Sequence, residues 1–133
     1  MNGFSQDIIS ILKHNVMYHH SAIGLILNGD EFPNSFSLVQ VLRLNRYLIE
    51  TKIDKMIKYD YIVINRGSLN VRMFLSCLTS LSAGGILILE ITGSDSRYED
   101  KYLNLIGGTM SATKIRYEDR SYIVIHTGED YGD

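Results

Sequence analysis

Two short polar segments, each next to an apolar run, contain the residue types in this sequence that best suit a ligand site. One follows "AIGLIL" and the other follows "YIVI"; their candidate binding residues are Asn28, Gly29, Asp30, Asn65, Arg66 and Gly67. In open parallel sheets, ligands bind beyond the carboxyl ends of the strands, which is where both segments would lie. The same residue types also form turns and helix caps, and each segment alone favours that role. A polar cleft follows if these segments and a third one, residues 92–94, come together.

The sequence lacks several common catalytic and metal-binding patterns. His19 and His20 are adjacent, so in an extended chain they point to opposite faces and are poorly placed to share a metal ion. Neither the Gly-x-Ser-x-Gly motif of hydrolases nor the phosphate-binding G-x-x-x-x-G-K-[ST] motif occurs. The one cysteine, Cys77, lies among apolar residues of a predicted helix, so we expect it in the core. We therefore predict no metal site, and no catalytic residue is identified.

The spacing of apolar residues predicts the elements that would position the candidate residues. Buried strands are predicted at 22–27, 60–65 and 86–91. Helices are predicted at 5–14, 35–50, 70–82 and 95–106. Gly84 and Gly85 would close the third helix, because glycine takes the positive φ values that end a helix. Alternation of polar and apolar residues around a polar turn predicts an antiparallel hairpin at 112–127.

Three buried strands joined through helices require a parallel sheet with right-handed crossovers and helices on both faces. With the hairpin at one edge, the predicted fold is an α/β, three-layer, Rossmann-like domain whose sheet has about five strands. The 133 residues, 45% of them hydrophobic, suffice for one such domain, and we predict that 1–133 is a single domain. Because the sequence shows neither a membrane span nor a signal peptide, we expect a cytoplasmic protein.

The order of elements over residues 58–127 resembles the C-terminal half of class I S-adenosylmethionine-dependent methyltransferases. Asp60 before "YIVIN" resembles the acidic residue that commonly precedes the fourth strand of that family. The Ala83-Gly84-Gly85 turn before "ILILE" resembles the turn before its fifth strand, and the terminal hairpin resembles its sixth and seventh strands. The resemblance implies the order first, fourth, fifth, seventh and sixth strand across the sheet.

The first half of the sequence departs from that family. Its members hold the cofactor with a glycine-rich turn after the first strand and with an acidic residue that ends the second strand. Here the turn offers Gly29 alone, and residues 28–59 leave no room for both the second and the third strand with their helices. We therefore interpret the chain as a single truncated, degenerate methyltransferase-like domain that acts as a binding or oligomerisation module. No cofactor is expected, and S-adenosylmethionine would bind more weakly than about 1 mM.

Two alternatives remain open. The first is a minimal S-adenosylmethionine-dependent methyltransferase, whose cofactor would lie over residues 28–31, 65–68 and 92–94. The second is a module that binds RNA or an acidic partner through the basic segment 43–58, although a solvated helix face is the favoured explanation of that segment. The net charge of −2 gives no general reason to expect nucleic acid.

The missing strands would leave strand 22–27 at an edge of the sheet. Its sequence "AIGLIL" has no charge and no proline, which are the features that normally protect an edge from pairing. We therefore expect another chain, most simply a second copy of this one, to cover the 22–27 edge in a homodimer or higher oligomer.

Overall fold

The computed structural model describes residues 3–15, 23–27, 48–50, 56–64, 70–91, 96–106, 110–118 and 120–127. Its helices are α1 (Gly3–Asn15), α3 (Val71–Thr79) and α4 (Ser96–Leu103). Its strands are β1 (Ile23–Leu27), β2 (Leu48–Glu50), β3 (Tyr59–Ile64), β4 (Leu81–Glu90), β5 (Ser111–Tyr117) and β6 (Arg120–His126).

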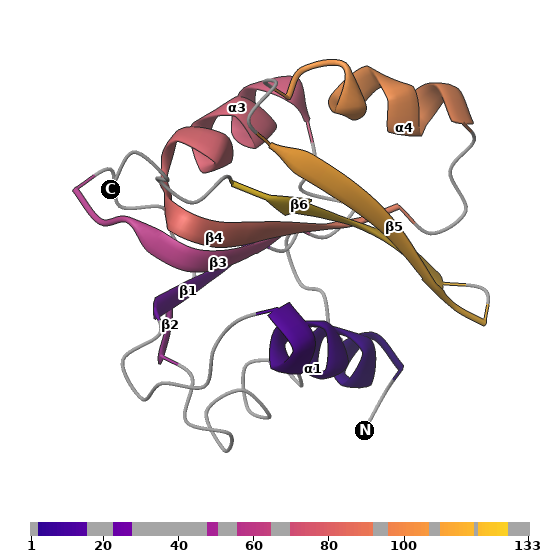
Figure 1. The fold of residues 1–133 in the computed structure, drawn as a ribbon, viewed down its shortest axis with the longest axis horizontal. Helices are drawn as coiled ribbons and strands as arrows, with labels where there is room; N and C mark the ends of the chain where they lie inside the picture. Colours follow the sequence, from indigo (N-terminus) through magenta and orange to yellow (C-terminus); the bar gives the residue numbers. More distant parts are fainter. Residues whose placement is uncertain are drawn as a thin grey trace.

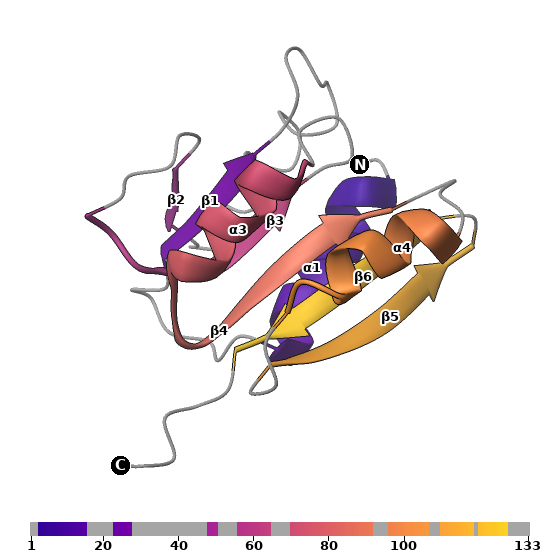
Figure 2. The same ribbon diagram turned by 90° about the horizontal axis from the view of Figure 1, so that it is seen from above.

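The strands form one sheet in the order β2-β1-β3-β4-β6-β5. β2, β1, β3 and β4 are parallel, whereas β6 pairs antiparallel with β4 and with β5. The α/β fold, the central position of β3 and the antiparallel pair at one edge are confirmed. Figure 1 shows α1 below the sheet and α3 and α4 above it, and Figure 2 shows the same arrangement from above.

Each face of the sheet has its own apolar layer. On the face of α1, the helix residues Ile8, Ile11 and Leu12 pack against a layer of Ile, Val and Tyr side chains from β1, β3, β4 and β6. On the other face, Phe74 and Cys77 of α3 and Tyr102 of α4 pack against Leu, Ile and Tyr side chains of β1, β3, β4 and β6. The predicted core position of Cys77 is thus confirmed. No helix of the described residues is long and apolar enough to cross a membrane.

The helix predicted at 70–82 ends earlier, so Gly84 and Gly85 do not close it. α3 begins after Asn70, whose side chain accepts a hydrogen bond from the backbone N of Met73 at 2.9 Å, and it ends at Thr79. Leu81 already pairs with Tyr59 in the sheet. The next pair joins Tyr61 to Ile86, so the double glycine lies in a bulge of β4, where Gly84 has a φ of 76°. The glycines still serve the backbone, but within a strand.

The prediction of a helix over 35–50 is wrong at residues 48–50, because Leu48–Glu50 is a strand. Residues 35–47 lie outside the described residues. β2 pairs in parallel with β1, Ile23 with Leu48 and Leu25 with Glu50. Residues 28–47 between them are long enough for a parallel crossover. β1 is therefore not an edge strand, and the sheet has a second strand that the sequence analysis excluded. The prediction that another chain covers the 22–27 edge was based on β1 being an edge strand, whereas β2 supplies backbone partners there.

Candidate functional site at the carboxyl edge

The strand order places a topological switch point at β1. The chain passes from β1 to β2 on one side and then returns to β3 on the other side. In open α/β sheets, ligands bind outside the carboxyl ends of the strands at such a point. Leu27, the last residue of β1, is paired with Ile64, the last residue of β3, and Ile64 is paired with Leu89 of β4.

The predicted binding residues follow directly on these strand ends. Residues 28–30 follow Leu27, and residues 65–67 follow Ile64, so both segments leave the sheet from one pair of neighbouring residues. Asn28, Gly29, Asp30, Asn65, Arg66 and Gly67 themselves lie outside the described residues, as do residues 92–94. Their side-by-side origin at the switch point remains the support for a shared site.

Glu50 is a candidate site residue that sequence reasoning missed. It is the last residue of β2 and stands opposite Leu25 of β1, one strand away from the switch point. The spacing of apolar residues instead predicted a helix over 35–50, with Glu50 as its last residue. An acidic residue directly after two apolar ones, in "LIE", was the available signal, but three residues are too few to distinguish a strand from a helix end by periodicity.

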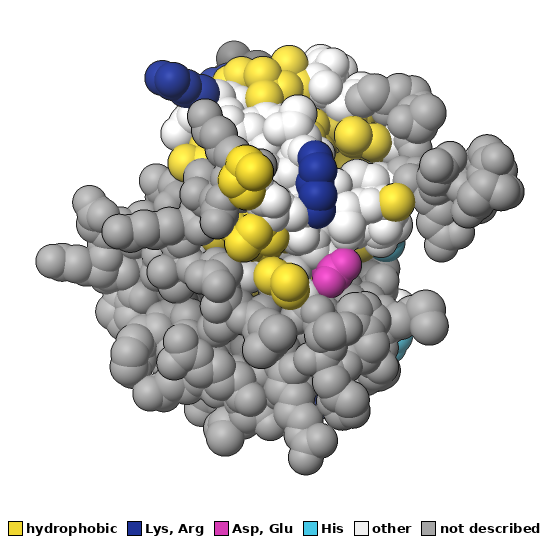
Figure 3. Space-filling view, turned by 90° about the vertical axis from the view of Figure 1, so that its left-hand side faces the viewer, with side chains coloured by type: hydrophobic (Ala, Val, Ile, Leu, Met, Phe, Trp, Pro, Cys, Tyr) yellow, Lys and Arg dark blue, Asp and Glu magenta, His cyan; other side chains and the backbone are white. Residues whose placement is uncertain are grey.

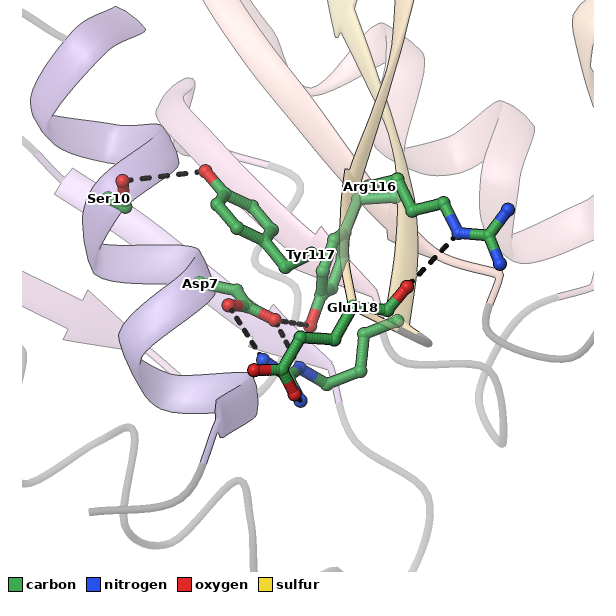
Figure 4. Close-up of polar contacts among 7 residues, drawn as sticks. Asp7, Ser10, Arg116, Tyr117 and Glu118 are labelled. Atoms are coloured by element: carbon green, nitrogen blue, oxygen red, sulfur yellow. Dashed lines mark hydrogen bonds and ion pairs between the residues drawn. The ribbon is translucent and has the colours of Figure 1, made fainter.

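A buried polar cluster lies at the same edge, where α1 meets the β5–β6 hairpin (Figure 4). Asp7 of α1 is only 4% exposed. Its carboxylate accepts hydrogen bonds from Arg120 Nε at 2.6 Å, from Arg120 Nη2 at 3.4 Å and from the Tyr122 hydroxyl at 2.8 Å. The buried charge is therefore both paired and hydrogen-bonded, which is the condition under which a carboxylate is tolerated in a core.

Neighbouring residues complete this cluster. The Tyr117 hydroxyl is 3.4 Å from Ser10 Oγ. The rings of Tyr117 and Tyr122 pack edge to face, with their centroids 6.2 Å apart. Arg120 Nη1 also lies 3.6 Å from the carboxylate of Glu118 in the hairpin turn. Burial is the main cause that raises the pKa of Tyr122 far above its ordinary value, and the hydrogen bond to Asp7 raises that pKa further. The Tyr122 hydroxyl thus remains a proton donor to Asp7 at any physiological pH.

The register of the sheet places this cluster at the carboxyl edge. Tyr122 is paired with Glu90, the last residue of β4, and β4 is the neighbour of β3. Figure 2 shows α1 running opposite to the parallel strands, so that the helix begins at the edge where those strands end. Asp7 and Arg120 are 113 residues apart, and nothing local in the sequence signals their contact.

At the opposite end of the sheet, where the parallel strands begin, the described polar contacts of Asp60 join neighbouring strands. Asp60 accepts hydrogen bonds from the backbone N of Ile23 at 2.9 Å and from Ser82 Oγ at 3.0 Å, which ties β1 and the bulge of β4 to β3. Figure 3 shows this end of the molecule, where the described hydrophobic side chains (yellow) cover more of the surface than the described charged ones (dark blue and magenta). The acidic residue that resembles the family pattern is therefore a connection between strands, remote from the carboxyl edge.

Comparison with known proteins identifies the fold. No protein-family model matches the sequence, and no curated protein matches it either. The structure is similar to the precorrin-6Y C5,15-methyltransferase of Geobacter metallireducens, with a TM-score of 0.60 at 8% identity over 93% of this chain and 89% of that chain. The chain has a class I methyltransferase-like fold.

Two further solved structures have the same fold. The ribosomal protein L11 methylase of Lactobacillus delbrueckii has a TM-score of 0.60 at 14% identity, over 97% of this chain and 81% of that chain. An N-methyltransferase of Haemonchus contortus, solved with S-adenosylhomocysteine, has a TM-score of 0.60 at 10% identity, over 96% of this chain and 38% of that chain. At such low identity, the likeness concerns the methyltransferase-like fold.

Proposed function

We propose that this chain binds S-adenosylmethionine at the carboxyl edge of β2, β1 and β3 and acts as a methyltransferase. The observation that carries the proposal is the parallel pairing of β2 with β1, which puts Glu50 at the carboxyl end of the second strand. An acidic residue at that position, about 20 residues after the first turn, is what a Rossmann-like sheet uses to accept hydrogen bonds from a ribose. The methyltransferase-like fold of the solved neighbours supports the same choice.

The chemistry of the residues fits the cofactor in part. The carboxylate of Glu50 suits the ribose hydroxyls, and Gly29, two residues after β1, suits a close approach of backbone to the methionine moiety. Asn65 and Arg66 follow β3 at the side of the switch point where a methyl acceptor would enter. The cofactor would supply the methyl group, which is activated by the positive charge on its sulfur. This chain's residues would bind it and orient the acceptor.

The binding-module hypothesis is less well supported than it was from the sequence. It rested on two departures from the family, a first turn with Gly29 alone and no room for a second and a third strand, and the second of these is changed because β2 is present. The RNA-binding alternative used the basic segment 43–58. Among the basic residues of this segment, Lys58 is the one that lies within the described part of the chain. Its Nζ donates a hydrogen bond to the Thr79 carbonyl oxygen at 2.5 Å, at the end of α3, so this lysine has a role within the fold.

Isothermal titration calorimetry with S-adenosylmethionine and S-adenosylhomocysteine tests the proposal. We expect saturable binding of one molecule per chain with a dissociation constant in the micromolar range, about −8 kcal/mol. Adenosine is the matched control, because it retains the ribose and lacks the methionine moiety, and it should bind more weakly. No binding of either compound at 1 mM would reject the proposed function and restore the binding-module hypothesis.

A further inference from the structure

Apart from Asp7, the buried side chains of helix α1 are aliphatic. They are Ile8, Ile9, Ile11 and Leu12, and they lie against Ile, Val and Tyr side chains of four strands. Burial of such groups stabilises contact without favouring a direction. Aliphatic packing alone therefore distinguishes poorly between the observed position of the helix and one shifted along its axis by a helical turn, roughly 5.4 Å.

The cluster of Asp7, Arg120 and Tyr122 does distinguish between such positions. The Asp7 carboxylate accepts hydrogen bonds from Arg120 Nε at 2.6 Å, from Arg120 Nη2 at 3.4 Å and from the Tyr122 hydroxyl at 2.8 Å. A shift of one turn would leave Asp7 buried without these donors, which costs far more than the loss of a contact on the surface. In this pair Asp7 is buried and the Arg120 side chain is 26% exposed. Replacing a buried ion pair by apolar side chains often leaves stability unchanged, so the best-attested use of such a pair is to specify register.

We propose that Asp7, Arg120 and Tyr122 are positioning residues that fix α1 along the sheet and thereby hold the carboxyl edge in its ligand-binding arrangement. The inference rests on the proposed function for its second part alone. Three observations support it: the helix begins at the carboxyl edge, Tyr122 is paired with the last residue of β4, and β4 is adjacent to β3 at the switch point.

An apolar triple variant, Asp7→Leu/Arg120→Met/Tyr122→Phe, separates positioning from stability. The first readout is the distance between spin labels at Lys13→Cys on α1 and Lys114→Cys on β5, which are both exposed. Cys77 is buried and stays unlabelled. With the native cluster we expect one narrow distance distribution; in the triple variant we expect a broadened or displaced one, while the unfolding transition remains cooperative. One narrow, unchanged distribution in the triple variant would overturn the proposal.

The second readout is binding of S-adenosylhomocysteine by calorimetry. We expect the triple variant to bind about tenfold more weakly than the native chain, or worse. The matched control is Asp60→Asn/Ser82→Ala, which weakens part-buried polar contacts at the opposite end of the sheet and should leave affinity unchanged. Equal affinity of native and triple variant would overturn the link between the cluster and the ligand site. If the native chain does not bind at all, the proposed function fails, and the spin-label distances still decide whether the cluster sets the register.

Discussion

The aromatic ring of Tyr61 lies directly over Gly24. The two residues are cross-strand neighbours in β3 and β1, and Tyr61 is fully buried on the face of α1. A Cβ atom on Gly24 would lie 1.9 Å from Cζ of the ring, far inside any van der Waals contact. Gly24, the second residue of β1, therefore provides space for a large side chain from the neighbouring strand, toward the amino end of β1.

Gly24→Ala should destabilise the fold by on the order of 3 kcal/mol, because the ring of Tyr61 must leave its place in a packed layer. Urea denaturation monitored by circular dichroism measures the loss. Combining Gly24→Ala with Tyr61→Val, which removes the ring, should recover part of the lost stability relative to the sum of the single variants. Strictly additive effects would show that the ring is not the cause.

Asp7→Ala should lower the free energy of unfolding by about 3 kcal/mol, because it removes the carboxylate that accepts the hydrogen bond of the buried Tyr122 hydroxyl and the closest ion-pair partner of Arg120. Tyr122→Phe removes one of the contacts of Asp7 and should cost only about 1 kcal/mol. Denaturant titrations of both variants at pH 7 provide the measurement. A larger effect of Tyr122→Phe than of Asp7→Ala would contradict the assignment of Asp7 as the centre of the cluster.

The two glycines in the bulge of β4 should both resist replacement, for different reasons. Gly84→Ala places a side chain at a φ of 76°, which costs about 1 kcal/mol. Gly85→Ala places Cβ 2.9 Å from the carbonyl oxygen of Ser82, so the backbone of the bulge must shift. The exposed neighbour Ala83 gives a control, since Ala83→Ser should change stability by less than about 0.5 kcal/mol. Thermal melts that rank Ala83→Ser as the most harmful variant would be inconsistent with this account.

Burial raises the pKa of the Cys77 thiol from 9.0 to about 12. Because the folded pKa is the higher one, the protonated thiol's contribution to stability is complete below pH 9 and is lost as the pH rises toward 12. Between these values, the native chain should lose roughly 1.4 kcal/mol per pH unit relative to Cys77→Ala, which cannot ionise there. Unfolding free energies of both chains at pH 8, 9 and 10 test this sign. Parallel curves would indicate that the thiol is accessible to water.

Glu50→Gln should weaken the binding of S-adenosylhomocysteine by roughly tenfold to a hundredfold, because a hydrogen bond to a charged group contributes about 1.5–3 kcal/mol. Asp100→Asn is the control, since Asp100 is an exposed residue of α4 and this variant should bind S-adenosylhomocysteine as the native chain does. Calorimetry of the two variants under identical salt provides the comparison. Equal loss in both would point to a general effect of negative charge.

The sequence alone determined those elements whose burial is continuous. The runs that became β1, β3 and β4 are apolar over several residues because both faces of a parallel sheet are covered, and such a pattern is readable without a structure. The hairpin was equally readable, since its polar turn separates two strands that pair locally. From these elements follow the central place of β3 and the position of residues 28–30 and 65–67 after neighbouring strand ends.

Tertiary structure decided the features that depend on pairing between distant residues. Leu48–Glu50 is a strand because β1 offers it a partner, and three residues carry no periodicity of their own. Leu81 joins the sheet because it pairs with Tyr59, although its spacing continues that of the preceding helix. Asp7 becomes a buried anchor only when Arg120 and Tyr122 approach it from the other end of the chain. The intrinsic preference of a short segment for helix or strand contributes little free energy. Hydrogen bonds and charges supplied by distant strands therefore override it.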